Sequence, residues 1–237
     1  MFNRQGESVS PDKIKSVSEP TLRRLPSYLH LLKRLDQQGR GIVSCTYISK
    51  DLKLDPTQVR KDLAATGIVG KPKIGYDVNN LIRSIESFLD WNNQTDAFLA
   101  GVGNLGRALM GYERFKDYGL NIVGVFDSDH EKIGTTVADR KILPIAKLPE
   151  LARRMHINIG IITAPAEAAQ IIADLMIEGG IIAIWNFAPT SIKVPDNVIV
   201  EKAHLYTSLA VLSHKLAEAL ANERSPEDEK GIANKLE

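Results

Sequence analysis

The sequence predicts the α/β fold class, with an N-terminal winged helix-turn-helix domain, a C-terminal Rossmann-like domain and a closing helix. Three observations predict it: short helical patterns precede residue 65, apolar strands alternate with helices after residue 95, and a glycine-rich turn joins the first such strand to a helix. The expected parts are a flexible arm at 1–19, a winged helix at 20–92, a Rossmann-like domain at 95–203, the closing helix at 204–222 and a flexible tail at 223–237.

Charge is divided unevenly between the two expected domains. The 237 residues have a net charge of +1 and are 43% hydrophobic. Residues 20–75 hold 11 Lys/Arg against 4 Asp/Glu, a net of +7, whereas residues 95–237 hold 15 against 19, a net of −4. A basic module joined to an acidic one suggests that the first module binds a polyanion, and scattered surface lysines are the alternative.

Composition also indicates the cellular compartment in which the protein is expected. The single cysteine, Cys45, rules out an intrachain disulfide framework and suits a reducing compartment. No apolar run is long enough to cross a membrane, and the polar N-terminus has no secretory segment, so we expect a cytoplasmic protein with no membrane partner. No cysteine or histidine cluster has metal-ligand spacing, so no metal site is expected. We interpret Cys45 as a small core residue, with a thiol sensor as the alternative.

The first domain begins with three helical patterns. Apolar positions recur at helical spacing between Thr21 and Leu35, and Ser44–Leu52 forms a second, short helix. The third helix starts at Asp55 and Pro56, an N-cap acid followed by proline at the first helical position. Its core face is expected to hold Val59 and Leu63, and its opposite face Thr57, Arg60, Lys61 and Ala64.

That layout is typical of a helix-turn-helix whose third helix enters the major groove of double-stranded DNA. The segment 67–76 has turn glycines around two lysines and predicts a hairpin wing beside phosphate or the minor groove. A small helical domain with a solvated basic face is the alternative. A further amphipathic helix at 78–89 and a polar break at 90–95 end the domain. The residues expected at DNA are Ser44, Thr57, Gln58, Arg60, Lys61, Lys71, Lys73 and Tyr76.

The second domain opens on the turn Gly101-Val-Gly103-Asn-Leu-Gly106, which follows an apolar run. In a dinucleotide site the first glycine permits the tight turn, the second lets the backbone approach the pyrophosphate, and the third lets helix pack on strand. The next strand, 121–127, ends in Asp127, an acid 21 residues after Gly106. Such a carboxylate bonds the adenosine ribose and repels a 2′-phosphate, which favours NAD(H) over NADP(H). A tight strand–helix turn with a surface aspartate is the alternative.

Apolar strands at 141–144, 157–163 and 181–186, with a helix at 165–178, suit a parallel sheet covered on both faces. The residues that follow two of these strands are expected to border the cofactor. The full set of expected cofactor-binding residues is Gly101, Val102, Gly103, Asn104, Leu105, Gly106, Asp127, Tyr112, Thr163, Pro165 and Asn186.

The closing helix has leucines at helical spacing: Leu205, Leu209, Leu212, Leu216 and Leu220. A stripe of this kind needs a surface to cover it. Packing on its own domain and packing on a dimer partner are both open.

Taken together, these motifs closely resemble the Rex family of bacterial redox-sensing transcriptional repressors. The matching pieces run in family order between about residues 24 and 220: Gln58–Leu63, Gly75-Tyr76, Gly101–Leu109, Phe126-Asp127, Pro165–Ala169 and Asn186–Pro189. The resemblance implies a homodimer with an exchanged closing helix, which binds operator DNA when empty or bound to NAD⁺ and is released by NADH. It also implies that Arg60 and Lys61 contact bases and that Tyr112 lies near the nicotinamide, although Tyr112 as a helix core residue is the alternative.

The chain departs from the family pattern at several positions. Ala65-Thr66 replace aromatic residues that commonly follow the recognition helix, and Lys73 replaces a wing glycine. His30 and His204 stand where the family has an arginine–aspartate switch pair. Two imidazoles cannot form a charge-assisted bidentate pair, so we hypothesise that the redox coupling is weakened, rewired or pH-dependent. The alternative is that each histidine packs or faces solvent.

Two rival functions remain at this point. An NAD-dependent oxidoreductase with a basic accessory domain would need an acid or base near the nicotinamide, and no convincing set is found. A nucleotide-binding dimer whose basic domain binds a protein is the second rival.

Overall fold

A computed structural model describes residues 17–203 and 205–233, and side chains within α8 are described for residues 206–221. Residues 1–16 of the arm expected at 1–19, the proposed switch residue His204 and residues 234–237 lie outside the described part. The last residue of that expected arm, Glu19, already begins α1. The chain divides into two units between Gln94 and Thr95, each with its own core. In the described part, no helix is long and apolar enough to cross a membrane.

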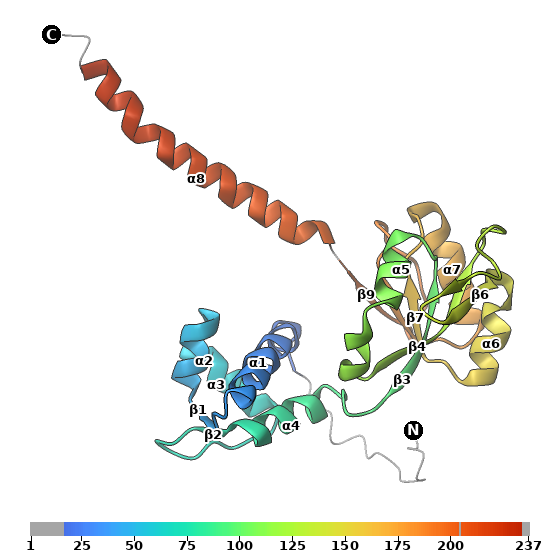
Figure 1. Cartoon of the computed structure of the whole chain (residues 1–237), viewed down its shortest axis with the longest axis horizontal. Coiled ribbons are helices and arrows are strands. Elements are labelled where there is room, and N and C mark those ends of the chain that lie inside the picture. The colour runs from blue at the N-terminus through green and yellow to red at the C-terminus, as the bar shows by residue number, and fades with distance from the viewer. Residues whose placement is uncertain (1–16, 204, 234–237) are drawn as a thin grey trace. The chain divides into compact units, whose positions relative to one another are not determined.

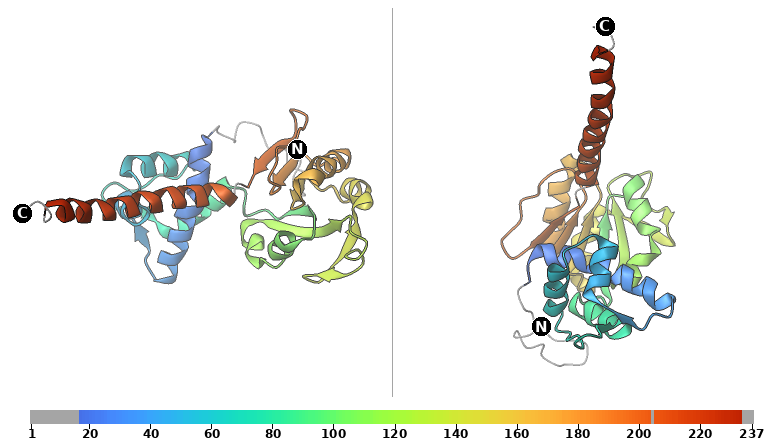
Figure 2. Two further views of the ribbon diagram at one scale, coloured as in Figure 1. Left: turned by 90° about the horizontal axis from the view of Figure 1, so that it is seen from above. Right: turned by 90° about the vertical axis from the view of Figure 1, so that its left-hand side faces the viewer.

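The first unit is a small helical domain with a two-stranded sheet. It consists of α1 (Glu19–Gln37), β1 (Ile42–Val43), α2 (Cys45–Leu52), α3 (Pro56–Ala65), β2 (Tyr76–Asp77) and α4 (Val78–Phe88). Figure 2 shows these helices, in blue to teal, gathered around one another. Their shared core is built from leucine, isoleucine and valine positions at helical spacing together with Tyr28, which is completely buried. All four helical patterns of this domain are therefore confirmed.

The wing is smaller than the hairpin expected at 67–76. Only Lys71 and Gly75 pair across it, and β2 pairs instead with β1, ahead of α2. Pro72 has no N–H to donate to a longer ladder, and Lys73 turns the chain with a left-handed φ of 62°. The wing is thus a tight loop of five residues, 71–75, anchored at the base of the helix-turn-helix.

The second unit is a seven-stranded sheet in the order β5-β6-β4-β3-β7-β8-β9, parallel except for β5. The strands are β3 (Thr95–Ala100), β4 (Leu120–Asp127), β5 (Thr136–Val137), β6 (Arg140–Pro144), β7 (Ile159–Ile162), β8 (Ala183–Asn186) and β9 (Ile199–Lys202). Without β5 this is the Rossmann order, with its switch point between β3 and β7. The parallel α/β sheet expected from the sequence is confirmed.

Helices lie on both faces of this sheet (Figure 1). The residues of α6 (Leu148–Met155) and α7 (Ala166–Glu178) pack into one core cluster with Phe98 and Phe126. On the other face, α5 (Asn104–Met110) and the 3₁₀ helix η2 (Glu113–Tyr118) pack with Val125 and Ile161. A second 3₁₀ turn, η3 (Ile145–Lys147), leads from β6 into α6.

The closing helix α8 spans Leu205–Ala233. The expected end at residue 222 is wrong, and the flexible tail predicted from residue 223 is helical as far as Ala233. Alanine, glutamate and lysine, which are strong helix formers, are frequent in this segment and favour the longer helix. Among the residues that the structure describes, none covers the leucine stripe fully, since Leu209, Leu212, Leu216 and Leu220 are 46–64% exposed.

Candidate functional site

The dinucleotide groove is a hollow of about 430 Å³ at the carboxyl ends of β3, β4 and β7. In open parallel sheets, ligands bind at this edge beside the switch point, where neighbouring loops diverge. Its lining residues are Gly101, Gly103, Asp127, Ser128, Asp129, Lys132, Ile145, Thr163, Ala164, Pro165, Ala168, Ile171, Ile172 and Leu175.

The three glycines of the turn have different surroundings. Gly101 has a φ of 99°, and a Cβ there would lie 2.7 Å from the backbone nitrogen of Ala164. A Cβ on Gly106 would collide with the carbonyl oxygen of Gly101, so α5 can pack this closely only with glycine. A Cβ on Gly103 would meet nothing within 4 Å, so the space beside Gly103 is open to a ligand.

Asp127 ends β4 and faces the glycine turn. Its Oδ2 accepts a hydrogen bond of 2.7 Å from the backbone N–H of Val102, and its Oδ1 accepts one of 2.9 Å from the N–H of Asp129. Lys132 Nζ lies 3.4 Å from Asp127 Oδ2 and 3.3 Å from Asp129 Oδ2. Asp127 is 7% exposed, so a ribose hydroxyl can reach the carboxylate only at the groove edge.

The charges around Asp127 stabilise one another. Burial alone would lower the pKa of Lys132, but its bonds to Asp129 and Asp127 outweigh burial and raise the pKa. The backbone N–H of Glu131, followed by Lys132, lowers the pKa of Asp129. At neutral pH Asp129 and Lys132 are therefore both charged at the polar end of the groove.

Five of the expected cofactor residues line this groove together: Gly101, Gly103, Asp127, Thr163 and Pro165. Val102 is buried, and Asn104, Leu105 and Gly106 begin α5 next to the groove. The Thr163 hydroxyl donates a 2.6 Å hydrogen bond to the Gly101 carbonyl, which ties β7 to the turn. These assignments stay predictions, supported by this common location.

Two expected cofactor residues lie elsewhere within the second unit. Tyr112 follows the far end of α5, is 47% exposed and packs edge-on against Phe115, in a separate hollow that also includes Arg140. Asn186 is buried and bonds the backbone of Thr190 and Ala188, which holds the turn after β8. Neither residue lines the dinucleotide groove.

The sequence interpretation missed part of the lining. The missed polar residues come soon after Asp127 in the sequence: Ser128, Asp129 and Lys132. The polar run after β4 was the signal that could have identified them. The apolar wall comes from η3 and α7: Ile145, Ala168, Ile171, Ile172 and Leu175. Ile171 is 64% exposed, which is unusual for a large apolar side chain on a helix packed against a sheet. A flat apolar ring such as adenine would cover this wall.

The wing groove is a second hollow, of about 390 Å³, in the first unit. It lies between the start of α2, the middle of α3 and the wing. Its lining residues are Ser44, Cys45, Thr46, Arg60, Gly70, Lys71, Pro72, Lys73, Ile74, Gly75 and Tyr76. Three of them are basic and none is acidic, so the groove suits a polyanion.

The division of α3 into two faces is confirmed. Val59 and Leu63 are completely buried, whereas Thr57, Arg60, Lys61 and Ala64 are exposed. Asp55 caps the helix by accepting hydrogen bonds from the backbone N–H groups of Thr57 and Gln58. Gln58 is half-buried, and its side-chain amide donates to Asp62 Oδ1 at 2.8 Å, so one of the two N–H groups of this amide is already used within the protein.

Ser44 and Tyr76 support the groove from its floor. The Ser44 hydroxyl caps α2 by accepting a hydrogen bond from the N–H of Tyr47. Tyr76 packs so close to Gly70 that a Cβ on Gly70 would lie 2.8 Å from the Tyr76 ring. Burial, followed by the neighbouring Cys45 thiol, raises the pKa of Tyr76, so its hydroxyl stays protonated at neutral pH. Cys45 itself is half-buried against the core.

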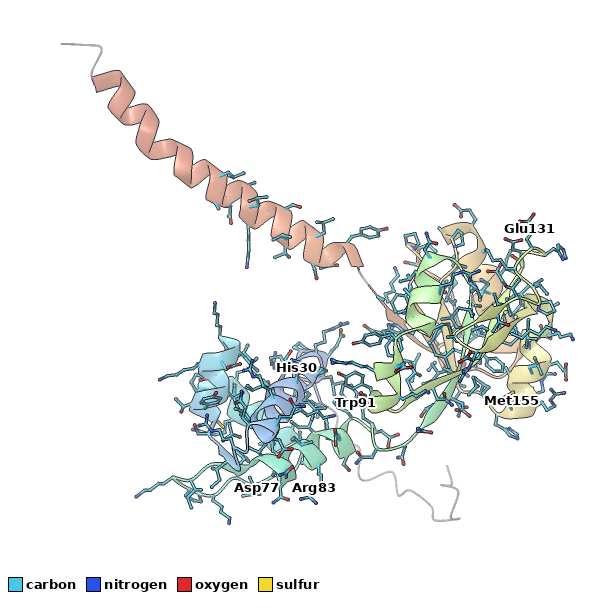
Figure 3. The ribbon with its side chains drawn as sticks, viewed as in Figure 1. His30, Asp77, Arg83, Trp91, Glu131 and Met155 are labelled. Atoms are coloured by element: carbon cyan, nitrogen blue, oxygen red, sulfur yellow. The ribbon has the colours of Figure 1, made fainter. Side chains whose placement is uncertain are left out.

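His30, expected from the sequence to be a switch residue, lies on α1 and is exposed (Figure 3). Because His204 is outside the described residues, the distance between the two histidines is not defined. In the described part, no group of three His, Cys, Asp or Glu side chains could hold a metal ion.

Known proteins match both units. Residues 16–64 match the family model described as "Putative DNA-binding protein N-terminus", and residues 92–190 match the model described as "CoA binding domain". The chain is 46% identical over 200 residues to the redox-sensing transcriptional repressor Rex of Treponema denticola, covering 84% of this chain and 95% of that protein. It is 43% identical over 203 residues to Rex of Bacteroides thetaiotaomicron, covering 84% and 91%.

Solved structures agree with these sequence relatives. The crystal structure of RSP, a Rex-family repressor, in complex with β-NAD⁺ and operator DNA matches with a TM-score of 0.81 and 33% identity, covering 89% of this chain and 97% of that chain. The complex of RSP with β-NADH matches equally well, at 32% identity, covering 89% and 99%. The relatives named here are transcriptional repressors, which decides against the oxidoreductase alternative.

Proposed function

Because this chain belongs to the Rex family of redox-sensing transcriptional repressors, we propose that it binds operator DNA along its wing groove and NAD(H) along its dinucleotide groove. It is a DNA-binding repressor that senses the NADH/NAD⁺ ratio, and it is not an enzyme. The residue assignment rests on one observation: the first unit has a basic groove, and the second unit has a groove at a glycine turn.

Arg60, which lines the wing groove, and the neighbouring Lys61 would reach base edges in the major groove from the exposed face of α3. Lys71 and Lys73 would neutralise phosphates beside the wing, which supplies affinity and register. Lys73 adopts a left-handed backbone conformation at a strain of about 1 kcal/mol, where a glycine would fit freely. The charge gained at this wing position would offset that strain by an additional phosphate contact.

In the dinucleotide groove, the pyrophosphate would approach the open space at Gly103, beside the N-terminal turn of α5. The adenine would lie on the apolar wall formed by Ile171 and its neighbours, and the ribose hydroxyls would bond Asp127. Asp127 and Asp129 would repel a 2′-phosphate, which favours NAD(H) over NADP(H) as the ligand.

The exposed leucine stripe of α8 supports a homodimer. Leu209, Leu212 and Leu216 are 57–64% exposed, and a continuous stripe of this size on a helix needs a covering surface. We propose that the second copy of the chain supplies that surface, as an exchanged helix would. Dimerisation would also present two α3 helices to the two halves of a palindromic operator.

A titration of operator DNA tests this function. A fluorescent palindromic duplex, selected from random DNA with the protein itself, is titrated without nucleotide, with NAD⁺ and with NADH. We expect NADH to weaken binding by about 5- to 150-fold relative to NAD⁺, the usual range of coupling between two sites. Tight binding that ignores both nucleotides, at every pH between 6 and 8, would show that the exchange of the family's switch pair for His30 and His204 has removed the coupling. Failure to select any duplex would contradict DNA binding and favour a protein partner for the basic domain.

A further inference from the structure

Asp62 is a buried acid on α3, directly after the two cations expected at DNA. It is 1% exposed, although it lies only one residue from the exposed Lys61. Buried carboxylates are rare unless they are paired, because removing the charge from water is costly. A buried acid on a helix that is otherwise expected to meet a polyanion therefore needs a specific reason.

Four side chains donate hydrogen bonds to this single carboxylate. Arg24 binds it with two nitrogens, Nε to Oδ2 at 2.6 Å and Nη2 to Oδ1 at 2.9 Å. The Tyr28 hydroxyl donates to Oδ2 at 2.6 Å, and the Thr21 hydroxyl donates to Oδ1 at 3.0 Å. The amide of Gln58 provides the fourth donor, from α3 itself. We call these five residues the Asp62 hub.

The hub joins two helices in a defined orientation. Thr21, Arg24 and Tyr28 recur on one face of α1, three and four residues apart, so three donors from α1 converge on one acceptor of α3. The bidentate contact of Arg24 fixes direction as well as distance, because the planar guanidinium matches the carboxylate in one arrangement. The buried Val59 and Leu63 also hold α3, but apolar contacts are non-directional and leave its rotation and sliding less defined.

Within the hub, Asp62 and Arg24 both stay ionised at neutral pH. Burial would raise the pKa of Asp62, but the hydrogen bonds from Arg24, Tyr28, Gln58 and Thr21 outweigh it and lower the pKa to about 2. The bond to Asp62 likewise raises the pKa of Arg24. Buried ion pairs contribute less to stability than their geometry suggests, because desolvation offsets most of the attraction. Their best supported use is to specify one arrangement among several of similar energy.

We propose that Asp62 and Arg24 are positioning residues that set the orientation of the recognition helix and thereby the discrimination of operator from other DNA. Arg60 and Lys61 precede Asp62 directly on α3, so a rotation of the helix that moves Asp62 also moves both cations relative to the bases. Gln58 belongs to this hub, which uses one of the two N–H groups of its side-chain amide. The inference rests on the proposed binding of operator DNA by α3.

The test separates discrimination from stability. Arg24→Met/Asp62→Leu replaces the pair by apolar side chains, and Arg24→Lys keeps the charge but loses the bidentate geometry. Arg34 and Asp51 offer a more exposed control pair, because Arg34 Nη2 contacts both Asp51 oxygens at 2.7 and 2.9 Å and the pair joins α1 to α2. Arg34→Met/Asp51→Leu therefore removes a similar pair elsewhere in the domain.

For each full-length variant, the dissociation constants for the selected operator and for a random duplex of equal length are compared, together with the thermal midpoint and NADH affinity. For both Arg24 variants we expect the preference for the operator, measured as the dissociation constant for the random duplex divided by that for the operator, to fall by about tenfold or more. The control variant should retain the preference of the wild type. Binding to the random duplex and to NADH should be unchanged. If Arg24→Met/Asp62→Leu does not fold, Arg24→Lys decides the question.

An unchanged ratio in a folded Arg24 variant would overturn the inference, as would an equal loss in the control. A loss of ratio that follows only the fall in thermal midpoint would also overturn it, because stability would then explain the effect. If the wild-type protein itself shows no preference for any duplex, the proposed function fails. If the wild-type protein prefers the operator and the Arg24 variants prefer it equally, only the inference about the Asp62 hub fails.

Discussion

Gly103 and Gly106 lie three residues apart in one turn, yet a methyl group has different consequences at the two positions. Gly106 is closed in by the Gly101 carbonyl and by the Thr163 hydroxyl, whereas Gly103 faces open space. Gly103 has a φ of −83°, which alanine adopts without strain. The protein fold therefore needs glycine at 106, whereas position 103 has room for a side chain, and the proposed pyrophosphate would use that room.

We accordingly expect Gly103→Ala to keep the thermal midpoint of the wild type and to lose NAD(H) affinity, because the new methyl group would occupy the space of the pyrophosphate. Gly106→Ala should lower the midpoint itself, since α5 must move away from the turn by overpacking, at a cost of about 1–3 kcal/mol. Calorimetric titration with NADH and thermal unfolding measure the two effects separately. Normal NADH binding by Gly103→Ala would place the pyrophosphate elsewhere.

At the scale of the element, α3 and the wing are expected to contribute different kinds of DNA contact. Arg60→Ala should weaken binding to the selected operator by about 1–3 kcal/mol and relax the preference for one base pair. Lys71→Ala should weaken operator and random duplex alike and reduce the slope of affinity against salt by about one unit. Competition binding at several salt concentrations distinguishes them, with Lys53→Ala on the exposed end of α2 as a control. Equal behaviour of Arg60→Ala and Lys71→Ala would contradict the assignment of α3 as the reading element.

Elements with a strong local signal could be predicted from the sequence, and those defined by distant partners could not. The start of α3 is set by Asp55 and Pro56 themselves, and the turn at Gly101 by its own glycines. By contrast, β2 pairs with β1 some 34 residues earlier, so no local pattern indicated that the wing would be only five residues long. The short strand β9 has a half-exposed pattern and becomes a strand only by pairing with β8.

The same distinction applies to the candidate sites. Asp127 could be predicted because its spacing from Gly106 follows from one strand–helix–strand unit. The apolar wall on α7 could not, because Ile171 reads as an ordinary helix residue until the fold brings it beside the glycine turn. The Asp62 hub likewise joins residues up to 41 positions apart, and its donors look like surface side chains in sequence.

At the scale of the whole molecule, the proposed homodimer would present two copies of α3 at a fixed spacing, and α8 offers the surface that would join the two chains. The leucine stripe lies on one side of α8, and Thr207 and His214 lie on the opposite side. A single chain of 26.1 kDa has one wing groove and can occupy only one half of a palindrome. Dimerisation and operator affinity should therefore be lost together.

We expect Leu209→Glu/Leu216→Glu to sediment as a monomer, because two carboxylates would have to be buried in the dimer interface. The variant should still bind a single half-site weakly, since the wing groove does not involve α8. Thr207→Glu/His214→Glu adds the same two acids on the other side of the helix and should remain a dimer with full operator affinity. Sedimentation equilibrium and operator titration on the same samples provide the measurement. A leucine variant that remains dimeric would show that the interface lies outside this stripe, whereas a monomer that retains full operator affinity would mean that one α3 helix suffices for recognition.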